Sequence, residues 1–189
     1  MATTKIEWCD SVWNPVTGCT PISEGCNHCY AKRMANRLRE RYGYPADDPF
    51  RVTFHTFRLG EPERMKKPRR IFVCSMSDIF HKDVSDDYLD CIFSVITKCS
   101  HHTFMVLTKR PNRMLDYISD WPHPMSNLWL GVTAENQARA DERIPILLQI
   151  PAAVRFVSVE PMLEYLRLDC LGPDGEDAAG WNTLSGEQP

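Results

Sequence analysis

The sequence contains no uncharged apolar run of about 18 residues, which is the length that a membrane-spanning helix needs. Its first residues, from Met1 to Trp8, also lack the apolar core of a secretory signal peptide. These two absences argue against membrane-spanning and secreted classes of protein. We therefore expect a cytoplasmic protein that has no membrane partner.

The sequence also lacks an excess of positive charge, since 22 lysine and arginine residues face 25 aspartate and glutamate residues. The net charge of -3 argues against a protein whose whole surface attracts nucleic acid. A local basic run occupies residues 64–70. We interpret this run as a solvated loop that precedes a strand.

A disulfide framework is not expected either, although the chain has eight cysteines. Stapled domains are usually small and secreted, whereas 189 residues with 43% apolar content suffice for one domain with its own core. Reduced thiols or metal ligation are the better interpretation. Cys74, Cys91 and Cys99 lie in apolar, periodic segments, and we expect them to be small core residues.

Apolar runs alternate with amphipathic runs along most of the chain. The alternation predicts strands at 70–75, 103–108, 127–133 and 153–159, an early strand near 6–8 or 12, and helices at 31–41, 85–100, 111–119 and 136–149, the last disturbed at Pro145. Residues 43–68 read as a loop-like insertion in which 52–57 pairs locally, and residues 172–189 as a linker or tail. Strands separated by helices predict an α/β fold with a mainly parallel sheet, either open or curved into a partial barrel.

Cys19, Cys26 and Cys29 form a C-x6-C-x2-C cluster just before a predicted helix. A structural zinc site uses four protein ligands and closes its coordination sphere. An iron–sulfur cluster that is held by only three thiolates keeps one iron open for a small molecule. The odd number of cysteines therefore favours a cofactor site over a closed structural one.

Polar residues follow each of the four main predicted strands, at the edge where ligands bind in parallel α/β folds. Serine and asparagine at such positions often cap helices instead of binding ligands, whereas a charge directly after a buried strand needs a partner. The candidate ligand-binding residues are Ser75, Ser77, Lys109, Glu135 and Glu160.

A three-cysteine loop after the first strand of a partial barrel, with an aromatic ring before the last cysteine, resembles the cofactor loop of radical S-adenosylmethionine enzymes. Several ordered blocks resemble, more specifically, the bacteriophage family that is named after gene products thirty-seven and sixty-eight. These blocks are WNPVTGC (13–19), CNHCYA (26–31), SMSDIFH (75–81), LTKRP (107–111), GVTAEN (131–136) and SVEP (158–161).

This resemblance implies a radical-enzyme-like partial barrel over residues 1–165, followed by a poorly ordered tail or truncated remainder at 166–189. It implies that Cys19, Cys26 and Cys29 hold a [4Fe-4S] cluster whose open iron binds S-adenosylmethionine. His28 would lie against adenine, Lys109 would pair with the methionine carboxylate, and Ser75, Ser77, Glu135 and Glu160 would hold the methionine or ribose ends.

The resemblance also implies two partners, and the chain departs from the families in two respects. An electron-donor protein would reduce the cluster, and a phage setting suggests a nucleic acid or nucleotide as substrate. The spacer of six residues between the first two cysteines is longer than the usual three. A glycine-rich block that follows in the phage family is absent, which suggests that the barrel is incomplete at its C-terminus.

Two other functions remain open at this point. Cys9 or His28 would supply a fourth ligand to the three cysteines in a structural zinc module without enzymatic activity. Alternatively, Asp78, His81, Glu135 and Glu160 would act at the strand ends of a hydrolase or nuclease, although no nucleophile or metal motif of diagnostic spacing supports this.

Overall fold

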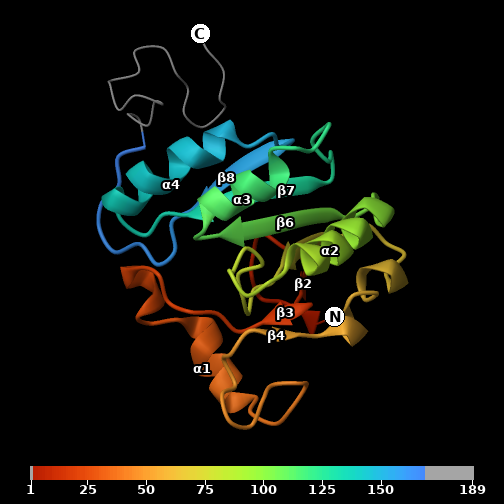
Figure 1. Cartoon of the computed structure of the whole chain (residues 1–189). Coiled ribbons are helices and arrows are strands. Elements are labelled where there is room, and N and C mark those ends of the chain that lie inside the picture. Colours follow the sequence, from red (N-terminus) through yellow and green to blue (C-terminus); the bar gives the residue numbers. More distant parts are fainter. Residues whose placement is uncertain (1, 169–189) are drawn as a thin grey trace.

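A six-stranded β-sheet forms the centre of the computed structural model, which describes residues 2–168 (Figure 1). Five strands are parallel in the order β2-β5-β6-β7-β8, and β1 pairs antiparallel with the outer side of β2. Because the strands follow one another in chain order, each crossover leads to the next strand. The strands are β1 (Ala2–Thr3), β2 (Ser11–Trp13), β5 (Arg70–Val73), β6 (Thr103–Thr108), β7 (Leu128–Thr133) and β8 (Val154–Ser158).

Three helices cover one face of this sheet, namely α2 (Asp86–Lys98), α3 (Pro111–Ile118) and α4 (Gln137–Gln149) (Figure 1). The Ser85 hydroxyl accepts the N–H of Tyr88 at 3.4 Å at the start of α2, and the Asn136 side chain accepts the N–H of Arg139 at 2.9 Å at the start of α4. Proline at the first turn begins α3, where its missing N–H has no helical partner to lose.

The core lies between these helices and the sheet, and it uses alternate residues of each strand. Ile71 and Val73 of β5 are fully buried against apolar side chains of the helices, whereas Phe72 between them points to the other face and is half-buried. On this second face, Phe72 contributes to the lining of a cavity. None of the helices within residues 2–168 has the length and apolar character to cross a bilayer.

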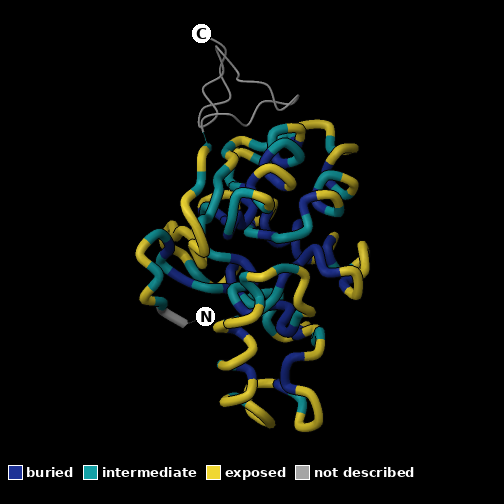
Figure 2. The backbone as a smooth tube through the Cα atoms, turned by 90° about the vertical axis from the view of Figure 1, so that its left-hand side faces the viewer, coloured by how far each residue is buried: buried dark blue, intermediate teal, exposed yellow. Residues whose placement is uncertain are grey.

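Residues 14–68 form a separate layer beside the sheet, from which α1 (Tyr30–Arg37) projects (Figures 1 and 2). In this layer β3 (Val16–Thr17) pairs antiparallel with β4 (Thr53–Phe54), and Ala31 and Ala35 of α1 pack into a small cluster with Tyr44, Phe50 and Met76. The remaining elements are three short 3-10 helices, η1 (Glu24–Cys26), η2 (Thr56–Arg58) and η3 (Pro62–Arg64).

The predicted fold class, an α/β protein with a parallel, partly barrel-like sheet, is confirmed. Three details of the expectation are wrong. Residues 53–54 pair with 16–17 and not locally, Pro145 lies inside an uninterrupted α4, and Cys91 is exposed on α2. The expected tail lies mostly outside the described residues, as does Cys170.

Candidate cofactor and metal centre

A cavity of about 200 Å³ opens at the carboxyl ends of the strands, and Cys19, Cys26 and Cys29 all line it. Residues 18–29 also lie at these strand ends, because they cross over the loops that follow the strands. The other polar residues of the lining come from the loop after β5 and from the ends of β6 and β7: Ser75, Ser77, Asp78, Thr108, Lys109, Arg110 and Thr133.

Gly18 fixes the approach of Cys19 to the sheet edge. Its N–H donates to the carbonyl of Met76 at 3.0 Å, and its own carbonyl accepts the Ser77 hydroxyl at 2.6 Å. The N–H of Cys19 donates to the carbonyl of Phe50 at 3.1 Å. The first cysteine is thus tied by its backbone to two neighbouring segments.

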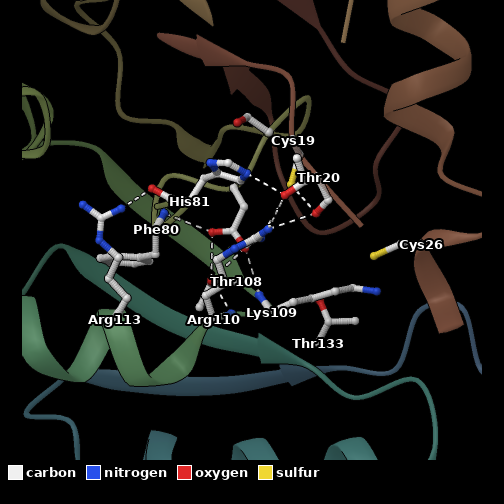
Figure 3. Close-up of polar contacts among 12 residues, drawn as sticks. Cys19, Thr20, Cys26, Phe80, His81, Thr108, Lys109, Arg110, Arg113 and Thr133 are labelled. Atoms are coloured by element: carbon white, nitrogen blue, oxygen red, sulfur yellow. Dashed lines mark hydrogen bonds and ion pairs between the residues drawn. The ribbon is translucent and has the colours of Figure 1, made fainter. Parts of the chain in front are cut away.

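Arg110 links Cys19 to the end of β6 (Figure 3). Its guanidinium donates to the Cys19 sulfur at 3.5 Å, to the Thr20 carbonyl at 2.9 Å and to the Asp78 carboxylate at 2.9 Å. Asp78 in turn accepts the Thr108 hydroxyl at 2.8 Å and the N–H of Lys109 at 3.1 Å. A buried carboxylate therefore orients the cation that contacts the first thiol.

A second charged group holds the turn that carries Cys26. Glu135 is 0% exposed, and it accepts a hydrogen bond from the Ser23 hydroxyl and ion pairs from Lys109 at 3.2 Å and Arg143 at 2.8 Å. The Ser23 hydroxyl also lies 3.7 Å from the Cys26 sulfur. Ser23, Lys109 and Glu135 thus connect the second cysteine to β6 and β7.

Gly25 allows this turn to come so close. A Cβ atom at position 25 would lie 2.9 Å from the Lys109 Nζ and 3.1 Å from the Glu135 carboxyl group. Outside the turn, Arg139 of α4 forms an ion pair with Glu24 at 3.0 Å. The hydrogen bonds from Arg139 lower the pKa of Glu24 to about 2.

The thiols differ in how readily they ionise. Burial and the nearby Asp78 charge raise the pKa of Cys19 to about 11, although Arg110 opposes this. Burial also acts to raise the pKa of Cys26, but backbone hydrogen bonds from Ile22 and Ser23 and the charge of Lys109 outweigh it and leave this pKa lowered. A bound metal deprotonates its thiol ligands, so the ionisation of Cys19 depends more on a positive centre than that of Cys26 does.

The candidate donor set consists of the three thiols that line the cavity. Three thiols line one cavity, yet residues 2–168 hold no group of three His, Cys, Asp or Glu side chains close enough together to bind one metal ion. Cys9 does not join the set, because it precedes β2 and therefore lies near the amino ends of the parallel strands, whereas the cavity lies at their carboxyl ends. The zinc module with Cys9 as fourth ligand is therefore not supported by the positions of its ligands.

The structure brings together only part of the predicted cofactor-binding set. Ser75, Ser77 and Lys109 line the cavity, and Glu135 lies directly behind Lys109. His28 is exposed and lines a separate hollow on the outer side of the cysteine loop. The exposed Glu160 follows β8 outside the cavity lining.

The groups that would serve a hydrolase are occupied by other contacts. Both ring nitrogens of His81 have partners, since Nε2 lies 2.8 Å from the Thr20 hydroxyl and Nδ1 accepts the N–H of Asp83 at 3.1 Å. Burial lowers the pKa of His81, so the ring is neutral at pH 7. The Asp78 carboxylate is held by the Thr108 hydroxyl and the Arg110 guanidinium, so neither Asp78 nor His81 is free of contacts within the chain.

Comparison with protein families gives a match to the model described as "Protein of unknown function (DUF5131)" over residues 3–187. The chain belongs to this family. No curated protein matches the sequence. The phage resemblance goes further than this membership and stays a prediction.

Among solved structures, this member of the family is similar to "Spore photoproduct lyase complexed with dinucleoside spore photoproduct". The TM-score is 0.63 at 14% sequence identity, and the match covers 87% of this chain and 49% of the other. The chain thus spans about half the length of that protein. At this identity the likeness shows the fold alone.

For several residues of the site, the sequence either does not predict the role that the structure shows or predicts a different one. Arg110 follows Lys109 directly, and its basic side chain at the end of β6 is a readable signal. Asp78 reads from sequence as a hydrolase residue, whereas in the structure it orients Arg110. Ser23 and Arg143 give no signal, because their roles depend on contacts with Glu135 across 112 and 8 residues of sequence.

We expect the free energy of unfolding to depend on pH through His55, which contacts the segment that precedes Cys19. The His55 side chain is 2% exposed, and its ring lies 2.8 Å from the Thr17 hydroxyl. Burial, helped by the Arg58 charge, lowers the pKa of His55 to about 4. Between pH 6.5 and 4 the unfolded chain therefore binds more protons at this site than the folded chain. The free energy of unfolding should fall as the pH drops through this window, by up to about 3 kcal/mol, and level off below it.

Urea unfolding at a series of pH values tests this expectation. The matched variant His55→Gln has no titrating ring, so the stability difference between wild type and variant should narrow as the pH falls from 6.5 to 4. A difference that stays constant across the window would contradict the lowered pKa.

Proposed function

We propose that the chain binds a [4Fe-4S] cluster through Cys19, Cys26 and Cys29 and acts as a radical S-adenosylmethionine enzyme. The observation that carries this proposal is the convergence of three thiols on one cavity at the carboxyl edge of the sheet. When bound, the cluster would leave one iron open to S-adenosylmethionine and supply the electron that cleaves its sulfonium, giving methionine and a 5'-deoxyadenosyl radical. The likeness to spore photoproduct lyase in fold supports the same proposal.

The surrounding residues have distinct proposed roles. Arg110 donates an N–H to the Cys19 sulfur and thereby stabilises negative charge on this ligand. Lys109 lines the cavity as a cation, and we propose that it binds the methionine carboxylate. Ser75 and Ser77 line the same cavity and would contact the ribose or methionine.

We assign Glu135 a positioning role and not a direct contact with the cofactor. Its carboxylate is already paired with Lys109 and Arg143, so it positions Lys109 and the Cys26 turn. Roles for His28 and Glu160 in cofactor binding stay predictions. An electron-donor protein is a proposed partner, and the dinucleoside photoproduct that spore photoproduct lyase binds supports a nucleic acid or nucleotide as substrate.

Iron binding tests the proposal directly. We expect anaerobically reconstituted protein to be brown, to hold about four irons per chain, and after reduction to form 5'-deoxyadenosine from S-adenosylmethionine. Replacement of Cys19, Cys26 or Cys29 by alanine should abolish iron binding. Cys9→Ala is the matched control and should leave the iron content unchanged, because Cys9 is buried at the opposite edge of the sheet.

A zinc module would give the reverse pattern. A colourless protein with one tightly bound zinc, lost equally on substitution of Cys9 and of Cys29, would overturn the radical proposal. Metal analysis and the absorption spectrum separate the two outcomes without any assay of substrate turnover.

A further inference from the structure

The exposed face of α1 carries a row of positive charge next to the cysteine loop. Lys32, Arg33 and Arg37 are all exposed, and the Tyr30 side chain on the same helix is 60% exposed. Residues 30–41 contain five basic residues and one acidic residue, Glu40, although the whole chain has a net charge of -3. Because α1 projects from the body of the protein, this face is open to a large partner (Figures 1 and 2).

Lys32, Arg33 and Arg37 lack side-chain partners in the part of the chain that the structure describes. By contrast, other basic residues of the same layer have partners within the chain. Arg51 forms an ion pair with Asp47 at 2.8 Å, and Arg58 donates a hydrogen bond to the Asn14 carbonyl at 3.1 Å. Unpaired exposed cations on one helix are available for an anionic ligand.

Two hollows flank Arg33 on this face. The larger, of about 320 Å³, is lined by Asn27, His28, Cys29, Lys32, Arg33 and Asn36. The smaller, of about 110 Å³, is lined by Tyr30, Arg33, Met34 and Arg37. Cys29 lines both the larger hollow and the cavity of the candidate metal centre, so the basic face adjoins that cavity.

We propose that this face of α1 binds a single-stranded nucleic acid, with its phosphates on Lys32, Arg33 and Arg37 and a base against Tyr30. Cations that track a backbone beside an exposed aromatic ring are the features by which proteins bind single strands. The amide groups of Asn27 and Asn36 add hydrogen-bonding capacity to the larger hollow.

A single strand also suits the neighbouring cavity, since an unstacked base can enter a site that an intact duplex would keep out. The inference rests on the proposed function in naming a substrate class for the same centre. Binding itself needs neither cluster nor turnover, so the two proposals can fail separately.

Fluorescence anisotropy of a labelled oligodeoxythymidine of about 12 nucleotides, measured with the full chain at several salt concentrations, tests the proposal. The triple variant Lys32→Gln, Arg33→Gln, Arg37→Gln should weaken binding at least tenfold in low salt. It should also reduce the slope of log K against log salt by about 2, since each phosphate contact to a single strand contributes about 0.7. Circular dichroism checks that the variant is folded.

The basic run at 64–70 provides the matched control. Lys66, Lys67 and Arg69 are exposed and precede β5, at the opposite edge of the sheet from the metal centre. The variant Lys66→Gln, Lys67→Gln, Arg69→Gln changes the net charge by the same amount, and it should leave oligonucleotide affinity within about twofold. Equal losses in the two triple variants would overturn the proposal, because they would reflect net charge alone.

Tyr30 separates a nucleic acid from other anionic partners. Tyr30→Ala should weaken oligonucleotide binding at least fivefold, whereas Tyr30→Phe should retain affinity, because stacking uses the ring and not the hydroxyl. If the α1 triple variant binds the oligonucleotide normally but is reduced more slowly by an acidic electron carrier, the face serves a protein partner and the proposal is wrong. The iron content of every variant, measured in parallel, shows whether the proposed cluster stands independently.

Discussion

The Gly18→Ala variant should lose about 3 kcal/mol or more of folding free energy, together with the ability to bind iron. Gly18 has a φ of +85°, a conformation that alanine adopts only with strain. A Cβ atom there would lie 2.0 Å from the Arg51 carbonyl oxygen and 2.4 Å from its carbon. Since these are backbone atoms, no side-chain rotation can relieve the overlap.

The loss should reach the candidate metal centre because of what Gly18 connects. Its N–H and carbonyl join the loop after β5 through Met76 and Ser77, and Cys19 follows directly. Displacing Gly18 therefore displaces the first thiol. Urea unfolding measures the stability, and iron analysis after anaerobic reconstitution measures the site.

Gly60→Ala is the control for this substitution. A Cβ atom at Gly60 would meet only the Glu63 carboxylate, at 3.9 Å, and the residue does not have a positive φ. Its stability should stay within about 0.5 kcal/mol of wild type, with full iron binding. Equal behaviour of the two variants would show that the tight approach at Gly18 does not exist in solution.

The periodic part of the chain is the part that sequence predicts well. The strand at 103–108 and the helix that starts after Ser85 follow from hydrophobic spacing and capping, which are local properties. The layer formed by residues 14–68 was not predictable in the same way. Its β3–β4 pairing joins segments that are 36 residues apart, and its glycine-dependent contacts leave no hydrophobic period.

The candidate site likewise has features that sequence predicts and features that it does not. Strand ends are visible in sequence, so the placement of Ser75, Ser77 and Lys109 at one edge could be predicted. The partner of each charge could not, because Glu135 is neutralised by Lys109 and Arg143 from different elements. The exposed position of His28 likewise depends on how the turn before α1 is folded.

The buried charges around Glu135 should make Glu135→Leu the most damaging side-chain substitution near the site. Arg143 is 1% exposed, and its Nη1 donates to Glu135 at 2.8 Å and to the Thr133 carbonyl at 2.7 Å, while its Nε has no hydrogen-bond partner. Removing the carboxylate leaves this cation buried without a counter-charge, which should cost about 3 to 5 kcal/mol of folding free energy. The Ser23 hydroxyl loses its acceptor as well, so the Cys26 turn should loosen.

A double variant distinguishes an uncompensated charge from lost packing. Glu135→Leu combined with Arg143→Met removes both buried charges, and it should recover at least half of the stability that Glu135→Leu loses, because apolar groups of similar size replace an ion pair at little cost. Lys109→Met alone should cost less than Glu135→Leu, since the Glu135–Arg143 pair remains intact. If the double variant is as unstable as the single one in urea unfolding, the pair does not balance a buried charge, and Glu135 stabilises the chain mainly through its contacts with the cysteine loop.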